Sequence, residues 1–172
     1  MKQSAVRIGL LLIAMAYLAA TGAAEAAHTL VVALGASSTA GKGVEVQQTY
    51  PAQLESMLNA LGLQVRVVDA GVNGDSSAGM LARLDADVPD GTRIVILQAG
   101  TNDAGAPGHN ENIAEIVARL KARSIRVVLF RTALMRDLRH DYTQDDGHHL
   151  TPEGYRILAS RLLPLVEREI HR

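Results

Sequence analysis

The sequence predicts an α/β fold of three layers, in which helices cover both faces of a parallel β-sheet. Three observations lead to this prediction. Four short apolar runs are rich in β-branched residues, as buried parallel strands are. Helical patterns alternate with these runs along the chain. A polar or glycine-rich segment follows each run, at the sheet edge where such folds bind ligands.

The first 26 residues have the layout of a secretory signal peptide. Lys2 and Arg7 form a basic start, an apolar stretch runs from residue 8 to about residue 20, and an A-x-A cleavage pattern lies at residues 24–26. The apolar stretch is short and ends in small residues, which favours a cleaved signal over a transmembrane span; an uncleaved anchor is the alternative. We therefore expect one domain, residues 27–172, that is secreted or periplasmic and needs no membrane insertion after signal cleavage.

The first half of this domain predicts two strands and a helix. The strands are residues 29–35 (TLVVALG) and 64–71 (QVRVVDAG). Between them, four apolar residues follow the i, i+3, i+4, i+7 spacing of one helix face, namely Leu54, Met57, Leu58 and Leu61. Pro51 lies near the expected start of this helix, where proline is tolerated.

The second half repeats this alternation. The strands are residues 93–100 (RIVILQAG) and 125–130 (IRVVLF), and the helix between them carries the same spacing at Ile113, Ile116, Val117 and Leu120. A last helix is expected to begin with Thr151 as N-cap and Pro152 at its first position. Pro164 is expected to kink or end it.

Composition excludes several classes of function. The chain has no cysteine, which rules out disulfides and thiolate metal sites. The formal net charge is −1 and no basic run is present, so no nucleic-acid partner is expected. Tryptophan is absent and phenylalanine occurs once, which argues against an aromatic sugar-stacking surface.

The segment LGASSTAGKGV, residues 34–44, directly follows the first strand and admits three interpretations. A phosphate loop needs G-x-x-x-x-G-K-[ST], but five residues separate Gly35 from Gly41 and Gly43 replaces the hydroxyl residue. A dinucleotide fingerprint needs G-x-G-x-x-G, which these glycines do not form. The remaining interpretation is a turn that presents Ser37 as a nucleophile.

The other strand ends supply the partners that a nucleophilic serine needs. Gly74 follows the second strand, and its N–H can approach a ligand because no Cβ stands in the way. Asn102 follows the third strand and offers a side-chain amide donor. Asp146 and His149 lie three residues apart, so the carboxylate can orient the imidazole while Nε2 acts as base on Ser37.

These residues resemble the SGNH hydrolases, also called GDSL esterases/lipases. The four blocks that match are Gly35–Thr39 for G-D-S-L-S, Gly74 in DAGVNGDSS, Gly100–Asp103 for G-x-N-D, and Asp146–His149 for D-x-x-H, with HLTPEGY behind the last. Asp145 and His148 also read D-x-x-H, but the continuation after His149 favours the pair Asp146 and His149. The first helix, YPAQLESML, is also similar to that of the family.

The resemblance implies a fold, an activity and a site. The fold is a flavodoxin-like α/β/α arrangement with a parallel sheet of four to five strands. The activity is that of a serine esterase of the lysophospholipase-like, arylesterase/thioesterase branch, acting on a small-molecule or lipid ester. The site has Ser37, His149 and Asp146 as its triad and an oxyanion hole formed by Ser37, Gly74 and Asn102. Neither a cofactor nor a metal is required.

Two departures from the family pattern keep other functions open. Ala36 replaces the acidic residue before the serine, and the segment 131–144 is short where relatives usually carry another helix and strand. These departures motivate a non-catalytic binding domain of the same fold. O-acyl transfer by the same residues is the alternative within enzymology.

Individual residues also have simpler interpretations. Ser37 and Gly74 could merely serve turns, Asn102 could cap the following segment, and Asp75 and Asp103 are expected to stabilise their loops rather than react. Residues 140–149 could hold a metal ion through carboxylate and imidazole groups. The late segment has four basic residues, Arg131, Arg136, Arg139 and His140. They could form a rim for an anionic substrate or belong to a plain solvated loop. Lys42 is expected to be a solvated loop charge.

Overall fold

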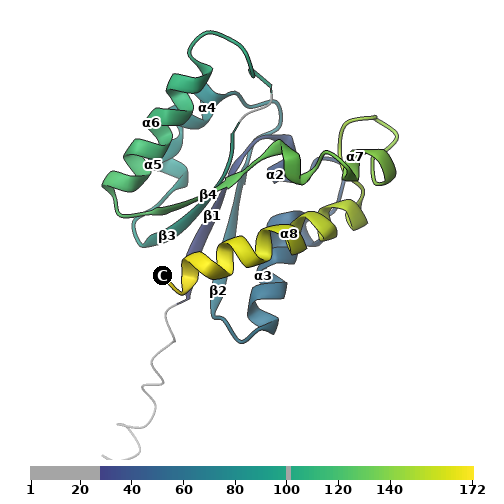
Figure 1. Cartoon of the computed structure of the whole chain (residues 1–172), viewed down its shortest axis with the longest axis horizontal. Coiled ribbons are helices and arrows are strands. Elements are labelled where there is room, and N and C mark those ends of the chain that lie inside the picture. Colours follow the sequence, from purple (N-terminus) through teal and green to yellow (C-terminus); the bar gives the residue numbers. More distant parts are fainter. Residues whose placement is uncertain (1–27, 100–101) are drawn as a thin grey trace, which may run out of the picture.

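A computed structural model describes residues 28–99 and 102–172 and shows helices on both faces of a parallel sheet (Figure 1). The strands are β1 (Thr29–Gly35), β2 (Val65–Gly71), β3 (Thr92–Gln98) and β4 (Arg126–Phe130), in the spatial order β2-β1-β3-β4. The three-layer α/β/α prediction is confirmed, with four strands among the described residues. The predicted signal peptide, residues 1–26, and the positions Gly100 and Thr101 of the third block lie outside the described residues.

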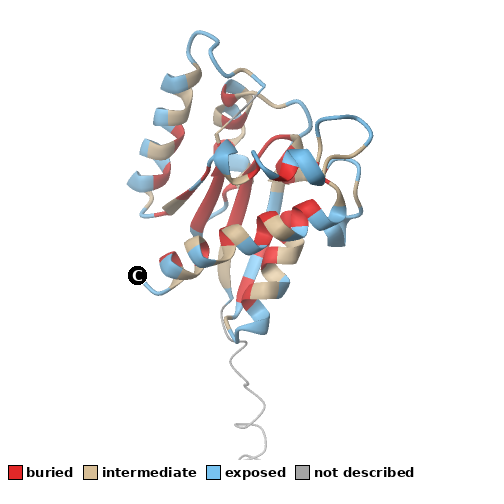
Figure 2. Cartoon of the chain, turned by 45° about the vertical axis from the view of Figure 1, so that its right-hand side comes forward, coloured by how far each residue is buried: buried red, intermediate tan, exposed pale blue. Residues whose placement is uncertain are grey.

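Two apolar layers hold the helices on the sheet, because side chains alternate along each strand. On β1, Val31 and Ala33 face one layer, while Val32 and Leu34 face the other. The first layer packs against α3 (Tyr50–Ala60) and α8 (Pro152–Ile170), and the second against α4 (Ser77–Ala82), α5 (Leu84–Asp87) and α6 (His109–Ala122). Figure 2 shows the buried residues concentrated in the sheet and on the inner faces of these helices.

The long C-terminal helix does not end at Pro164. Thr151 accepts a hydrogen bond from Gly154 N–H at 3.2 Å and Pro152 stands in the first turn, as predicted. The helix nevertheless runs through Pro164 to Ile170. Leu162 and Val166 on either side are fully buried against the sheet, and their packing outweighs the one backbone hydrogen bond that proline cannot make.

The short segment after β4 forms no further strand among the described residues. It contains a 3₁₀ turn (Thr132–Leu134) and a single helical turn, α7 (Leu138–Asp141), before the chain enters α8. β4 is therefore an edge strand of the described sheet. No helix in the described part of the chain is both long and apolar enough to cross a membrane.

The parallel register brings the carboxyl ends of the strands together. Gly35 of β1 lies opposite Gly71 of β2, and Leu34 lies opposite Leu97 of β3. The segments that follow these strands meet at this one edge, where α2 (Ser37–Ala40) and α7 are also found (Figure 1). The candidate site is built from them.

Candidate active site

Ser37 begins α2, two residues after β1 ends at Gly35. Gln98 at the end of β3 holds this turn, since its buried Oε1 accepts hydrogen bonds from Ala36 N–H at 3.1 Å and the Thr39 hydroxyl at 2.6 Å. A Cβ at Gly35 would lie 2.1 Å from Thr39 Oγ1 and 2.6 Å from Gln98 Oε1, so this packing requires glycine. Neutral hydrogen bonds thus hold the Ser37 turn where Ala36 replaces the family's acidic residue.

His149 lies between Ser37 and Asp146. Its Nε2 is 2.9 Å from Ser37 Oγ, and its Nδ1 is 2.5 Å from Asp146 Oδ2. An ionised carboxylate can only accept, so Nδ1 of the neutral ring carries the proton and Nε2 accepts from the Ser37 hydroxyl. The His149 side chain is 12% exposed and that of Asp146 is 39% exposed. The structure therefore brings the three predicted triad residues together in the expected order.

The turn around Asp146 keeps its carboxylate ionised. Oδ1 accepts hydrogen bonds from His148 N–H and His149 N–H, both at 2.9 Å. The His149 N–H, the His149 imidazole and the His148 N–H together hold the pKa of Asp146 well below its usual range. Of the two possible D-x-x-H registers, the hydrogen bond to the imidazole joins Asp146 to His149, the register that the sequence favours.

Asp146 and His149 lie in a small hairpin, residues 143–150, here called the His149 hairpin. Thr143 and Leu150 form an antiparallel bridge, and Gln144 N–H donates to His149 C=O at 2.8 Å. Gln144 Nε2 also donates to Lys42 C=O at 2.9 Å, which ties the hairpin to the loop after α2. The second glycine of GKG, Gly43, has a φ of +85°, and a Cβ there would lie 2.1 Å from Gln144 Oε1. The positive φ thus favours glycine where the two segments meet, and a Cβ there would displace the Gln144 amide.

Gly74 and Asn102 occupy the loops that follow β2 and β3. Gly74 has a φ of +77°, a conformation that favours glycine. Asn102 Nδ2 donates to Asp75 C=O at 2.7 Å, so its side chain joins the two loops instead of capping α6, and its second N–H is not used by that bond. Neither Ser37 N–H nor Gly74 N–H donates to another residue that the structure describes.

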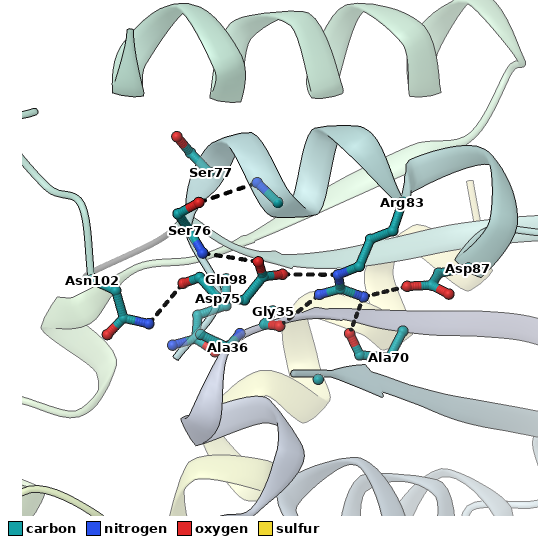
Figure 3. Close-up of polar contacts among 12 residues, drawn as sticks. Gly35, Ala36, Ala70, Asp75, Ser76, Ser77, Arg83, Asp87, Gln98 and Asn102 are labelled. Atoms are coloured by element: carbon teal, nitrogen blue, oxygen red, sulfur yellow. Dashed lines mark hydrogen bonds and ion pairs between the residues drawn. The ribbon is translucent and has the colours of Figure 1, made fainter. Parts of the chain in front are cut away.

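Arg83, which follows α4, ties three of these segments together (Figure 3). Its Nε donates to Asp75 Oδ2 at 2.8 Å, Nη2 donates to Gly35 C=O at 2.9 Å, and Nη1 donates to Ala70 C=O at 2.8 Å. Nη1 also pairs with Asp87. The ends of β1 and β2 and the Gly74 loop therefore share one guanidinium. The sequence signal for this role is weak: a single arginine in the helical stretch after Gly74, with an aspartate four residues later.

Asp103 anchors the loop that follows Asn102. Its Oδ2 accepts hydrogen bonds from Ser77 N–H at 2.9 Å and from the Ser77 hydroxyl at 2.5 Å, and its Oδ1 is 3.1 Å from His109 Nδ1. Burial raises the pKa of Asp103, but the hydrogen bonds from Ser77 and His109 outweigh it and lower the pKa. The loop-stabilising roles expected of Asp103 and Asp75 match these contacts.

A cavity of about 350 Å³ opens over Ser37. It is lined by Ser37, Ser38, Lys42, Gly74, Asn102, Arg139, His148 and His149. Arg131 and Arg136 line another cavity, at the ends of β3 and β4. His140 pairs with Asp141 at 2.6 Å, and no three His, Asp or Glu side chains gather in a metal-binding group within the described ranges.

The sequence matches the model of the GDSL-like Lipase/Acylhydrolase family over residues 33–142. It is 36% identical over 109 residues to the esterase TesA of Pseudomonas aeruginosa, a match that covers 60% of this chain and 54% of that protein. It is 29% identical over 119 residues to an arylesterase of Vibrio mimicus, covering 64% of this chain and 58% of the other. The chain thus spans little more than half the length of these curated relatives.

The fold is similar to that of solved esterase structures. A crystal structure of the psychrotrophic esterase EstA from Pseudoalteromonas sp. superposes with a TM-score of 0.74 at 17% sequence identity. The match covers 84% of this chain and 100% of that one. At this level of identity the similarity concerns the fold alone.

Proposed function

This chain belongs to the GDSL-like lipase/acylhydrolase family, and on that premise we propose that it hydrolyses carboxylic esters or thioesters through an acyl-enzyme on Ser37. The observation that carries the proposal is the row of two hydrogen bonds from Ser37 Oγ to His149 Nε2 and from His149 Nδ1 to Asp146 Oδ2. A serine alone is a weak nucleophile, and this row supplies both a base and a group that orients the base.

In the first half-reaction His149 Nε2 takes the hydroxyl proton while Ser37 Oγ attacks the carbonyl carbon. The imidazolium that forms is stabilised by the ionised Asp146 carboxylate. The tetrahedral intermediate collapses when His149 gives its proton to the leaving alcohol or thiol, and the acyl group stays on Ser37.

In the second half-reaction a water molecule replaces the alcohol. His149 takes a proton from the water, whose oxygen attacks the acyl-enzyme carbonyl. The second tetrahedral intermediate collapses as the proton passes to Ser37 Oγ, which releases the carboxylic acid and restores the starting state.

The developing oxyanion is held by three donors: Ser37 N–H, Gly74 N–H and the second N–H of Asn102 Nδ2. The positive φ of Gly74 and the hydrogen bond from Asn102 to Asp75 C=O support this arrangement, since they fix both donors before substrate arrives. Loss of one such donor typically costs about 2.7–4 kcal/mol of transition-state stabilisation.

Two finer assignments belong to the same proposal. The substrate is a small-molecule or lipid ester, as in the lysophospholipase-like and arylesterase branch that the sequence resembles. Residues 1–26 act as a secretory signal peptide and place the domain in the periplasm or the medium.

Turnover of p-nitrophenyl esters, from acetate to long acyl chains, tests the proposal. We expect the purified protein to release p-nitrophenol and free acid, and Ser37→Ala to lower kcat by at least about 10³-fold. Ser160→Ala is the matched control, because Ser160 lies exposed on α8 and bonds only its own helix. A folded protein that releases no p-nitrophenol contradicts the proposal and favours a binding domain; formation of a new ester in place of free acid would indicate acyl transfer.

A further inference from the structure

The cavity over Ser37 is lined by polar and cationic side chains. Among the described residues that line it, none carries an aliphatic or aromatic hydrocarbon side chain, and none carries a carboxylate. A long acyl chain bound there would leave water without gaining apolar contact. The wall instead contains hydroxyl, amide, imidazole and cationic groups, which favour a small polar substrate.

The cationic groups of this wall are not neutralised by nearby carboxylates. Lys42 and Arg139 are exposed, and neither forms an ion pair with any carboxylate of the described residues. The carboxylates nearest in sequence to Arg139 are engaged elsewhere: Asp137 with Arg161 and Asp141 with His140. The wall therefore offers an entering substrate two cationic side chains that no described carboxylate pairs with directly.

The residues that carry these cations belong to segments that contact the His149 hairpin. Arg139 belongs to α7, and its C=O accepts from the Thr143 hydroxyl at 2.5 Å, where the His149 hairpin begins. Lys42 C=O accepts from Gln144 of the same hairpin. Gly74 and Asn102 belong to the other two loops, which Arg83 and Asp75 hold together. The lining residues thus fall into two groups: Lys42 and Arg139 belong to segments tied to the His149 hairpin, and Gly74 and Asn102 belong to the two loops joined by Asp75.

The chemistry of ester cleavage determines which part of the substrate meets each group. The carbonyl oxygen must face the oxyanion donors, which include Gly74 and Asn102. The leaving oxygen must lie within reach of His149 Nε2, which protonates it. The alcohol moiety therefore extends toward His149, whose hairpin contacts the segments of Lys42 and Arg139.

We propose that the ester taken by this site carries an anionic group, a carboxylate or a phosphate, on its alcohol moiety, where Lys42 and Arg139 bind it. This inference rests on the proposed ester hydrolase and names its substrate class. The acyl moiety is short. The two cations stabilise both the bound ester and the transition state, so they raise kcat/KM chiefly by lowering KM.

Matched aryl acetates test the proposal. The anionic substrate is 3-acetoxybenzoate and its neutral counterpart is 3-acetoxybenzamide, with rates corrected for hydroxide-catalysed hydrolysis of each. At low ionic strength we expect kcat/KM to favour the anionic ester by about five- to tenfold, and the preference to fall in 0.5 M NaCl, because exposed ion pairs are weak and screened. A second pair of esters, monophenyl succinate and phenyl butyrate, places the negative charge on the acyl side. We expect kcat/KM to show no preference for the anionic ester of this pair.

A second test of the proposal removes positive charge from the cavity wall. Lys42→Gln and Arg139→Gln should each reduce the anionic-over-neutral ratio by about two- to threefold. Lys121→Gln and Arg93→Gln are matched controls, since both residues are exposed, form no ion pair with a described carboxylate and lie toward the opposite end of the sheet. These controls should leave the ratio unchanged.

The outcomes separate this inference from the proposed function. The inference would be overturned if both acetates were hydrolysed with equal kcat/KM and if neither Lys42→Gln nor Arg139→Gln altered the anionic-over-neutral ratio. The proposed ester hydrolysis would still stand in that case. A preference for the succinate would also overturn it, since the cations would then serve the acyl side. Failure to hydrolyse any of the four esters would contradict the proposed function itself.

Discussion

Arg83 is the residue on which the positions of several site loops depend. Its guanidinium contacts the ends of β1 and β2 and the Asp75 carboxylate, whose side chain is only 10% exposed. Removal of the cation leaves that carboxylate without its partner, a change that typically destabilises by several kcal/mol when the pair is buried. The loop that carries Gly74 would lose its anchor at the same time.

We therefore predict that Arg83→Gln lowers the free energy of unfolding by about 2–3 kcal/mol and also lowers kcat for ester hydrolysis. Urea denaturation and steady-state kinetics measure the two effects. Arg156→Gln is the control, because its bidentate pair with Glu153 is exposed and should contribute no more than about 1 kcal/mol. Equal behaviour of the two variants would contradict the role given to Arg83.

The positions of Arg83 and Gln98 explain why the sequence did not indicate their roles. Arg83 meets Gly35, 48 residues away, and Gln98 meets Ala36, 62 residues away. Such contacts exist only once the sheet has formed, and no local spacing of residues in the sequence indicates them. Ser37, Asp146 and His149 were predictable because they stand in short blocks at the ends of expected elements. The structure brings these three together, while their catalytic roles remain a proposal.

Asp69 is an exposed residue on β2, and we expect its carboxyl group to make stability depend on pH. Desolvation raises the pKa of its carboxyl to about 6, although Gly71 N–H donates to it at 2.9 Å. The folded-state pKa is thus above the unfolded value, so folding favours the protonated form. The stabilisation is fully present below about pH 4 and is lost as the pH rises through about 6.

Asp69→Asn keeps a neutral side chain at every pH. We predict that its free energy of unfolding exceeds that of the parent protein by about 1 kcal/mol above pH 7, and that the difference vanishes toward pH 4. The difference is smaller than the full pKa shift would give, because water reaches this residue. Urea denaturation between pH 4 and pH 8 measures it. Asp90→Asn, at a fully exposed carboxylate, should follow the parent protein. A pH-independent difference for Asp69→Asn would refute the assignment.

The strands were the most predictable elements. β1 matches the expected range at both ends, and the other three strands differ by one or two residues at their ends. These strands are continuous apolar runs because both faces of the sheet are covered by helices. Local composition is therefore enough to locate them in the sequence. Local composition did not indicate α7, and it did not indicate that α8 continues past Pro164, where Leu162 and Val166 are buried.

Gly43 lies where the loop after α2 meets the His149 hairpin. Gly43→Ala would introduce a Cβ 2.1 Å from Gln144 Oε1 and would also strain a positive φ. We predict that this variant lowers kcat by at least about tenfold, because displacement of Gln144 moves His149 relative to Ser37.

Gly91→Ala separates this displacement from backbone strain. Gly91 has a similar φ of +86°, but nothing lies within 4 Å of the Cβ position. Both variants should lose about 1 kcal/mol of stability. Steady-state kinetics should show the kcat loss in Gly43→Ala alone, and equal kcat values for the two would count against a positional role of the hairpin.

At the scale of the whole molecule, the topology determines which residues meet. A parallel sheet places the ends of its strands at one edge, so the segments after β1, β2 and β3 converge there although they are far apart in sequence. The chain then returns through α7 and the His149 hairpin to the same edge before α8 covers the sheet. The segment that the sequence marked as short adds no described strand, yet it carries Arg139 to the cavity.

The proposed mechanism requires Ser37 to be an activated nucleophile. A fluorophosphonate reacts with such a serine by forming an Oγ–P bond and releasing fluoride, while the hydroxyl proton passes to His149. Mass spectrometry of the labelled protein measures this directly. We expect one adduct, on Ser37, formed rapidly and lost in His149→Ala. A folded protein that forms no adduct, or forms it on another residue such as Ser38, would contradict the proposed role of Ser37.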